Sequence, residues 1–204
     1  MRGRFICIEG GEGTGKTAIS GLLANYLIKQ GRNVDVVADP GSAPLSQELR
    51  KIVINKSIPC NPLQQAMLYL TARSALAEEL KVMLNDGHDV ICGRWTLSTM
   101  VYQGVCQGVP LVLIEELTKT LVDLSPDIYI LLDCPPEIAV ERKRIADPQA
   151  FAQDRFDSRG MDWHNKIRDA YKRFAAQYNY LCVDASRPLP EVQQDVIKLC
   201  SNWT

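Results

Sequence analysis

The stretch FICIEGGEGTGKT, residues 5–17, places a short apolar run directly before a glycine-rich turn and a lysine. The apolar run has the pattern of a buried strand, and the glycines that follow it indicate a loop. From Lys16 onward, apolar side chains at positions 19, 22, 23 and 27 recur at helical spacing until Gly31 ends the pattern. We therefore predict a strand, a loop and a helix, in this order, at the start of the chain.

The same alternation continues along the rest of the chain. Further apolar runs predict strands at 34–38, 89–92, 128–132 and 180–183. Helical spacing predicts helices at about 45–54, 63–84 and 111–124, another after the prolines at 135 and 136, and a last one from about 188. Strands that alternate with helices form a parallel sheet covered on both faces. We predict an α/β fold with three layers around a five-stranded parallel sheet. Because no linker, repeat or low-complexity tract interrupts it, we expect residues 1–204 to form a single domain.

Composition limits the classes of function. The 23 basic and 24 acidic residues give a net charge of −1, so we expect no nucleic acid polymer as a partner. No apolar stretch approaches 18 residues, and the run before Glu9 is too short for a signal peptide, so we expect no membrane partner. The seven cysteines are odd in number and lack metal-ligand spacing, and the presence of only two histidines argues against a His-based metal site or a hydrolase triad. We therefore expect a cytoplasmic protein with reduced cysteines.

The turn after the first strand fits the pattern G-x-x-x-x-G-K-[ST], the P-loop. Its residues are Gly10, Gly11, Glu12, Gly13, Thr14, Gly15, Lys16 and Thr17. Backbone amides of such a turn, and the N-terminal end of the following helix, surround phosphate oxygens. We expect this turn to bind ATP, with Lys16 on the β- and γ-phosphates and the Thr17 hydroxyl on Mg²⁺. The chain contains no Asn-Lys-x-Asp run and no apolar strand ending in Asp-Glu, so a kinase for a small acceptor is favoured over GTPases and motor ATPases.

The segment CGRWTLSTMVYQG, residues 92–104, follows the third predicted strand. With it, the chain resembles the thymidylate kinase family, which carries an Asp-Arg pair here followed by Ser and Tyr-Gln at this spacing. Three further motifs match in order, namely Asp39-Pro40-Gly41, residues 67–73 and Asp154-Arg155. The resemblance implies a P-loop NTPase fold with a lid segment. It also implies phosphorylation of dTMP to dTDP by ATP and Mg²⁺, a step of dTTP biosynthesis, and a homodimer formed through long helices.

The resemblance also implies an acceptor site. Arg94 would bind the 5′-phosphate of the acceptor, Tyr69 would stack on the base, and Arg73 would donate to a base carbonyl. Ser98 and Thr99 would contact the base edge. The full set of substrate-binding residues implied is Glu12, Asp39, Tyr69, Arg73, Arg94, Ser98, Thr99 and Tyr102. Tyr102 would crowd the sugar 2′ position, and Glu12 would face the sugar or Arg94. From the residues alone, an aromatic such as Tyr69 on a long amphipathic helix is more often a core residue, and the alternative for Arg94 is a surface ion pair.

Residues 141–173 carry nine basic and six acidic side chains, a local excess of positive charge. We predict a lid at about 142–157, with a mobile loop at 146–153, because cations that close over a migrating phosphoryl group stabilise its charge and exclude water. The catalytic residues that we expect are Lys16, Arg94, Arg142, Arg144 and Arg155. The alternative is a solvated helix end whose arginines only complement the helix dipole.

Three positions depart from the family pattern. Gly93 stands where the family has the Asp of its Asp-Arg pair, which helps to place Mg²⁺. Ala38 replaces an Arg, and Ala75 replaces a Gln. These departures leave three alternatives open: a kinase for another or modified pyrimidine deoxynucleotide, a deoxynucleoside kinase, and a nucleotide-binding module with weakened catalysis.

Overall fold

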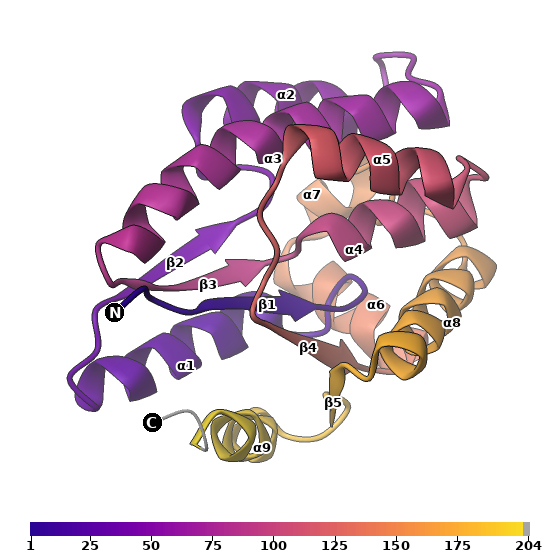
Figure 1. Ribbon diagram of the computed structural model, residues 1–204. Helices are drawn as coiled ribbons and strands as arrows, with labels where there is room; N and C mark the ends of the chain where they lie inside the picture. The colour runs from indigo at the N-terminus through magenta and orange to yellow at the C-terminus, as the bar shows by residue number, and fades with distance from the viewer. Residues whose placement is uncertain (202–204) are drawn as a thin grey trace.

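The computed structural model describes residues 1–201, apart from the side chains at 150, 153 and 201 (Figure 1). Its five strands are β1 (Phe5–Glu9), β2 (Val34–Ala38), β3 (Asp89–Gly93), β4 (Ile128–Asp133) and β5 (Leu181–Asp184). They form one sheet in the order β2-β3-β1-β4-β5, and every neighbouring pair is parallel. The predicted five-stranded parallel sheet is thus confirmed, with strand bounds within one residue of those expected.

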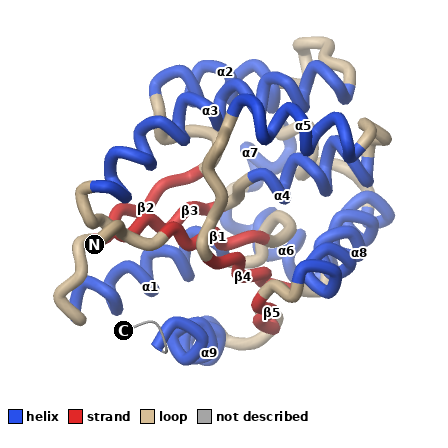
Figure 2. Tube along the Cα trace, in the orientation of Figure 1, coloured by secondary structure: helices blue, strands red, loops and turns tan. Residues whose placement is uncertain are grey.

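Helices cover both faces of this sheet (Figure 2). They are α1 (Lys16–Lys29), α2 (Pro44–Ile54), α3 (Pro62–Asn85), α4 (Thr96–Thr99), the π-helix η1 (Met100–Cys106), α5 (Leu111–Leu121), α6 (Pro136–Ala146), α7 (Pro148–Gln153), α8 (Met161–Tyr178) and α9 (Leu189–Ser201). Helices α1 and α9 lie on one face, whereas α3 and α5 lie on the other, with α2 packed outside α3 (Figure 1). No helix within residues 1–201 has the length and apolar composition needed to span a bilayer.

The central strand β1 is buried over its whole length. Its side chains alternate between the two faces, as the period of a strand requires. Ile6 and Ile8 pack with α1 and α9, whereas Phe5 and Cys7 pack with α3. A strand buried on both faces reads as a continuous apolar run, which explains why this strand was predicted correctly.

Two segments differ from the prediction. The expected loop at 146–153 contains the short helix α7, and the polar segment after β3 is helical through α4 and η1. The long helix α8 was not predicted as an element. Its apolar residues, among them Ile167, Tyr171 and Phe174, form only a narrow buried stripe among charged positions. Such a stripe becomes recognisable once its partner surface on η1 is known.

The chain order reverses at β1, which lies between β3 and β4. The carboxyl ends of parallel strands meet at one edge of the sheet, and a reversal of this kind opens a crevice there. The backbone amide of Arg94, just after β3, donates to the carbonyl of Ile8 in β1. The loops after β1 and β3 therefore start side by side.

Candidate active site

The glycine-rich turn after β1 wraps against α6. A Cβ added to Gly13 would lie 1.7 Å from the carbonyl oxygen of Ala139, and the φ of Gly13 is 71°. Gly15 precedes α1 in the left-handed region, and no side chain caps the first amides of this helix. Only glycine fits both positions without strain, and the turn leaves the N-terminal end of α1 open to an anion.

Lys16 folds back over this turn. Its Nζ donates to the carbonyls of Gly10 and Gly11, at 3.0 and 2.6 Å. Burial, together with the nearby charge of Arg94, lowers the pKa of Lys16 to about 7, although Glu12 acts against this. The ammonium therefore lies at the centre of the turn, where phosphate oxygens would replace the two carbonyls as its partners.

A cavity of about 1190 Å³ opens beside the turn and receives the side chains of Lys16 and Thr17. The end of β2, helix α6 and the segment after β5 complete its wall. Arg142 reaches across this wall and donates to the carbonyls of Ala185 and Ser186, at 2.7 and 2.9 Å. The larger cavity thus brings together the predicted ATP-binding turn and one of the predicted lid arginines.

A smaller cavity of about 90 Å³ lies between α3, η1 and the segment after α7. It is lined by every acceptor-site residue that the resemblance implied, namely Glu12, Asp39, Tyr69, Arg73, Arg94, Ser98, Thr99 and Tyr102. These residues come from four separate segments of the chain. The fold therefore places them together, as the order of the motifs had suggested.

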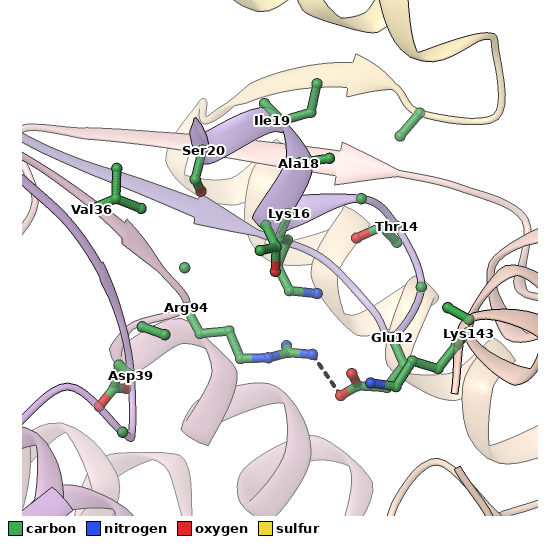
Figure 3. Close-up of a pocket in the computed structure, with 18 of the residues that line it drawn as sticks. Glu12, Thr14, Lys16, Ala18, Ile19, Ser20, Val36, Asp39, Arg94 and Lys143 are labelled. Atoms are coloured by element: carbon green, nitrogen blue, oxygen red, sulfur yellow. Dashed lines mark hydrogen bonds and ion pairs between the residues drawn. The ribbon is translucent and has the colours of Figure 1, made fainter. Parts of the chain in front are cut away.

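The two cavities share one wall, which carries five charged side chains. Figure 3 shows four of them, Glu12, Asp39, Arg94 and Lys143. The shared residues are Glu12, Asp39, Pro40, Arg50, Ile54, Arg94 and Lys143. In Figure 3, Lys143 extends from α6 toward Glu12, and the Lys16 ammonium points to the same region. This wall is the point at which groups bound in the two cavities would meet.

Arg94 is held in place by four acceptors. Its Nη2 lies 2.5 Å from Glu12 Oε1, and its Nη1 donates to Gly10 O, Ser98 Oγ and Tyr171 OH, at 2.9 to 3.3 Å. Its own backbone has a φ of 75°, a strained value for a residue with a side chain. Burial alone would raise the pKa of Glu12, but Arg94 and Lys16 lower it to about 2. The guanidinium is therefore preorganised beside an ionised carboxylate.

A second ion pair lies deeper in the smaller cavity. Arg73 donates from Nε to Asp39 Oδ2 at 2.6 Å and from Nη1 to Thr99 Oγ1 at 3.0 Å. Both Arg73 and Asp39 are at most 2% exposed, and burial raises the pKa of Asp39 although Arg73 acts against this. The Oδ1 of Asp39 has no hydrogen-bond partner among the described residues. The pair fixes the direction of Arg73 before any ligand is present.

Glu9 is a site residue that the sequence analysis missed. Its carboxylate is fully buried at the end of β1 and accepts from the amide of Trp95 at 2.8 Å and from Tyr171 OH at 3.0 Å. It also accepts from Ser98 Oγ at 2.8 Å, so Ser98 is held by Glu9 and Arg94. The sequence does carry a signal for Glu9, because it is an acidic residue at the end of an otherwise apolar strand.

Four further residues on these walls were also not predicted. Arg50 and Lys143 lie where the two cavities meet, and Asp157 lies 3.8 Å from Lys143. Gln103 lines the smaller cavity, and its Nε2 is buried with no partner among residues 1–201. Gln103 adjoins Tyr102 in the quoted motif and could have been found there. In the sequence, Lys143 lies between Arg142 and Arg144, the two arginines that are predicted to be catalytic.

Two predicted lid residues lie elsewhere in this conformation. Arg144 pairs with Glu141 on the same helix, at 2.7 and 2.8 Å, and is not among the described residues that line either cavity. Arg155 donates to the carbonyls of Asn55 and Ile58 instead of facing a cavity. The catalytic roles expected for both residues therefore stay predictions.

Two of the three departures from the family pattern lie on the wall of the larger cavity. Gly93 ends β3 on the wall of the larger cavity, and an added Cβ would come no closer than 4.0 Å to the carbonyl of Val37. Ala38 ends the neighbouring strand β2 on that wall. Ala75 packs against the core from α3. Gly93 thus leaves space where a longer side chain would fit.

Known proteins resemble this chain over most of its length. The family model described as Thymidylate kinase matches residues 8–196. A thymidylate kinase of Chlamydia felis is 35% identical, over 91% of both chains. One of Geobacter sp. (strain M21) is 36% identical over 90% of this chain and 85% of its own, and one of Thermoanaerobacter sp. (strain X514) is 29% identical over the full length of both. The chain therefore belongs to the thymidylate kinase family.

Proposed function

We propose that the protein transfers the γ-phosphoryl group of ATP to dTMP and forms ADP and dTDP. The observation that carries this proposal is the wall shared by the two cavities, where Arg94, Lys143 and Arg50 meet. The larger cavity takes ATP through the turn at 10–17. The smaller cavity takes the acceptor, so that its 5′-phosphate points at the γ-phosphate across this wall.

In the reaction, an oxygen of the dTMP phosphate attacks the γ-phosphorus, and the bond from this phosphorus to the β-γ bridging oxygen breaks. The migrating group spreads negative charge over its oxygens, so catalysis rests on position and on nearby cations. Arg94 holds the acceptor phosphate with a planar fork of donors, and Lys16 holds the β- and γ-phosphates. Lys143 is the lid cation whose side chain already lies at the shared wall.

Mg²⁺ fits this site as a nucleotide-bound ion. The chain offers the Thr17 hydroxyl on the wall of the larger cavity, and phosphate oxygens would complete an all-oxygen set. Within the described part of the chain, no three His, Cys, Asp or Glu side chains cluster into a metal site. Bound Mg²⁺ neutralises charge on the β- and γ-phosphates. With Gly93 in place of a carboxylate, Thr17 is the ligand that we propose from the protein.

The smaller cavity supports recognition of a pyrimidine base. Tyr69 offers a ring for stacking, and Arg73 and Thr99 offer polar groups to the base edge. The buried Nε2 of Gln103 needs an acceptor, which a base carbonyl supplies. The Tyr102 hydroxyl donates to Glu12 Oε1 at 3.1 Å, and this contact supports a role for the Tyr102 ring beside the sugar, where it would disfavour a 2′-hydroxyl.

We propose that residues 142–157 act as the lid. Arg142 lies on the wall of the larger cavity and would contact ATP directly. Arg144 would have to leave Glu141, and Arg155 would have to leave its two carbonyls, before either could contact the transferring group. Closure of this segment would exclude water and so suppress ATP hydrolysis.

We further propose a homodimer in the cytoplasm. Large apolar side chains are exposed on the outer helices, including Met67 and Val82 on α3 and Val112 on α5. Burial of such side chains against a second copy would remove them from water. All seven cysteines are free thiols, which supports a reducing compartment. Light scattering coupled to size exclusion tests the oligomeric state.

A coupled assay that follows ADP release tests the function. We expect turnover with dTMP to exceed that with dUMP, and both to exceed turnover with dCMP, dAMP and dGMP. Thymidine, which lacks the 5′-phosphate that Arg94 binds, should give no turnover. Turnover of another monophosphate without activity on dTMP or dUMP would overturn the substrate. Turnover of thymidine in place of dTMP would indicate a nucleoside kinase.

A further inference from the structure

The far end of the proposed lid is fastened to the loop between α2 and α3. Arg155 Nη2 donates to the carbonyls of Asn55 and Ile58, each at 2.6 Å. The Arg155 amide donates to the carbonyl of Ile54, and Asn55 pairs with Asp154 in an antiparallel bridge. We call residues 54–58 and 152–155, which make these contacts, the strap.

Lys56 strengthens the strap from the other side. Its Nζ donates to the carbonyl of Ala152 at 2.6 Å. Asn55 is the C-cap of α2, so the Arg155 cation lies at the negative end of this helix. Each of the two segments of the strap therefore contributes one basic side chain that binds backbone carbonyls of the other segment.

Part of the strap lines the smaller cavity, and we call Ile54, Asp154, Phe156 and Asp157, which line it there, the roof. Ile54 lines this cavity from one segment of the strap, and Asp154 lines it from the other segment. Phe156 and Asp157, which follow directly, line it too, and the Phe156 ring lies 5.7 Å from that of Tyr102. A nucleotide that enters the smaller cavity must therefore contact residues held by the strap.

The same segment of chain leads back to the wall between the cavities. Helix α6 carries Lys143 at this wall, α7 follows it, and the strap comes next. Helix α2 links both regions as well, because Arg50 in this helix lies on the shared wall and donates to the carbonyl of Pro40. The roof of the smaller cavity and two cations of the shared wall, Arg50 and Lys143, thus belong to the two segments that Arg155 joins.

We propose that Arg155 is a positioning residue, which couples binding of the acceptor under the strap to the placement of Lys143 at the point of transfer. This proposal rests on the proposed function, because it assigns ATP and dTMP to the two cavities. It differs from the transition-state contact that the sequence predicts for Arg155. The guanidinium binds backbone carbonyls of the loop between α2 and α3, and its effect on the reaction passes through the lid.

The test compares Arg155→Ala, Arg155→Lys and the matched control Arg173→Ala. Arg173 is an exposed arginine on α8 that contacts Phe174. Calorimetry gives the Kd for dTMP with and without a non-hydrolysable ATP analogue, and the ratio of the two values is the coupling between the cavities. The same preparations give kcat and the KM for dTMP.

We expect Arg155→Ala to reduce the coupling ratio by about fivefold or more, within the usual range of such couplings. The KM for dTMP should rise, and hydrogen exchange of residues 152–157 should no longer slow when dTMP is added. Arg155→Lys keeps a cation that can reach the carbonyls and should recover part of the coupling. Arg173→Ala should leave the coupling ratio, the KM for dTMP and the exchange of residues 152–157 unchanged.

A fall in kcat with an unchanged coupling ratio and KM would overturn the proposal and support the transition-state contact. If Arg155→Ala does not fold, Arg155→Lys and Lys56→Gln still weaken the strap, and unchanged coupling in both would overturn the proposal equally. Wild-type turnover of dTMP in the same series keeps the two hypotheses apart. Absent wild-type turnover refutes the proposed function. Normal wild-type turnover refutes only the role of Arg155 if the wild type shows no coupling, or if Arg155→Ala leaves the coupling ratio unchanged.

Discussion

Arg94 Nη2 lies 2.5 Å from Glu12 Oε1, so the turn that we assign to ATP and the arginine that we assign to the acceptor phosphate are already joined. A phosphate that binds Arg94 must share its guanidinium with this carboxylate. Because like charges repel, the acceptor phosphate and Glu12 would shift apart while both remain on the fork of donors. The pair thus links the two proposed nucleotide sites, because both of its residues line both cavities.

Arg94→Ala should remove the guanidinium that we expect to bind the acceptor phosphate. Loss of a preorganised donor of this kind costs on the order of 100- to 1000-fold in turnover, so kcat/KM for dTMP should fall by at least about 100-fold. Steady-state kinetics measures this change, and Lys81→Gln, at an exposed pair with Glu78, is the control. Arg94→Lys should recover only part of the loss, because it lacks the fork. Unchanged kinetics in Arg94→Ala would refute the site.

ATP binding should take up a proton above pH 7. Burial and Arg94 lower the pKa of Lys16 to about 7, so much of this amine is neutral at pH 8 in the free protein. Bound phosphates favour the ammonium form, and the affinity for ATP should fall by up to about tenfold per pH unit above the pKa. Calorimetry at pH 8 in two buffers of different ionisation enthalpy measures the uptake.

Lys16→Met is the matched variant for that measurement, because it removes the titrating group and should remove the proton uptake with it. ATP binding whose enthalpy does not depend on the buffer in the wild type would contradict the lowered pKa.

Gly93→Asp should raise the apparent affinity for Mg²⁺ several-fold in the presence of ATP. The position accepts a Cβ, and a carboxylate there would face the larger cavity beside the turn. Gly93→Asn, of nearly the same shape but without the charge, should have little effect. Titration of Mg²⁺ followed by ATP-analogue binding separates affinity from turnover. Equal behaviour of the two variants would show that a charge at this position does not act on the metal.

Arg73→Met should destabilise the fold by about 3–5 kcal/mol, because it leaves the buried Asp39 without its cation. The double variant with Asp39→Asn should regain much of this loss, since it also removes the buried charge. Urea denaturation of the single and double variants gives the coupling energy. A double variant no more stable than Arg73→Met would contradict the pairing. Both variants should bind dTMP weakly whatever their stability.

The sequence predicted the fold well, because its signals are local. Each strand is a short apolar run, and the alternation of these runs with helical spacing is typical of one class of fold. The helices that were not predicted lack such a local signal. Helix α7 is short, and α8 keeps its buried face among so many charges that only contact with η1 distinguishes it.

By itself, the sequence determined the phosphate-binding turn at 10–17, the parallel sheet that holds it and, through ordered motifs, the members of the acceptor site. Only the tertiary structure decided what those members contact: Arg94 meets Glu12 across 82 positions, and Arg73 meets Asp39 across 34. The tertiary structure also decided that Arg155 binds the loop between α2 and α3, and that Lys143 lies at the shared wall. The physical reason is that periodicity and turn chemistry act between near neighbours in the chain, whereas the partner of a charged side chain depends on which distant segments packing brings within a few ångströms of it.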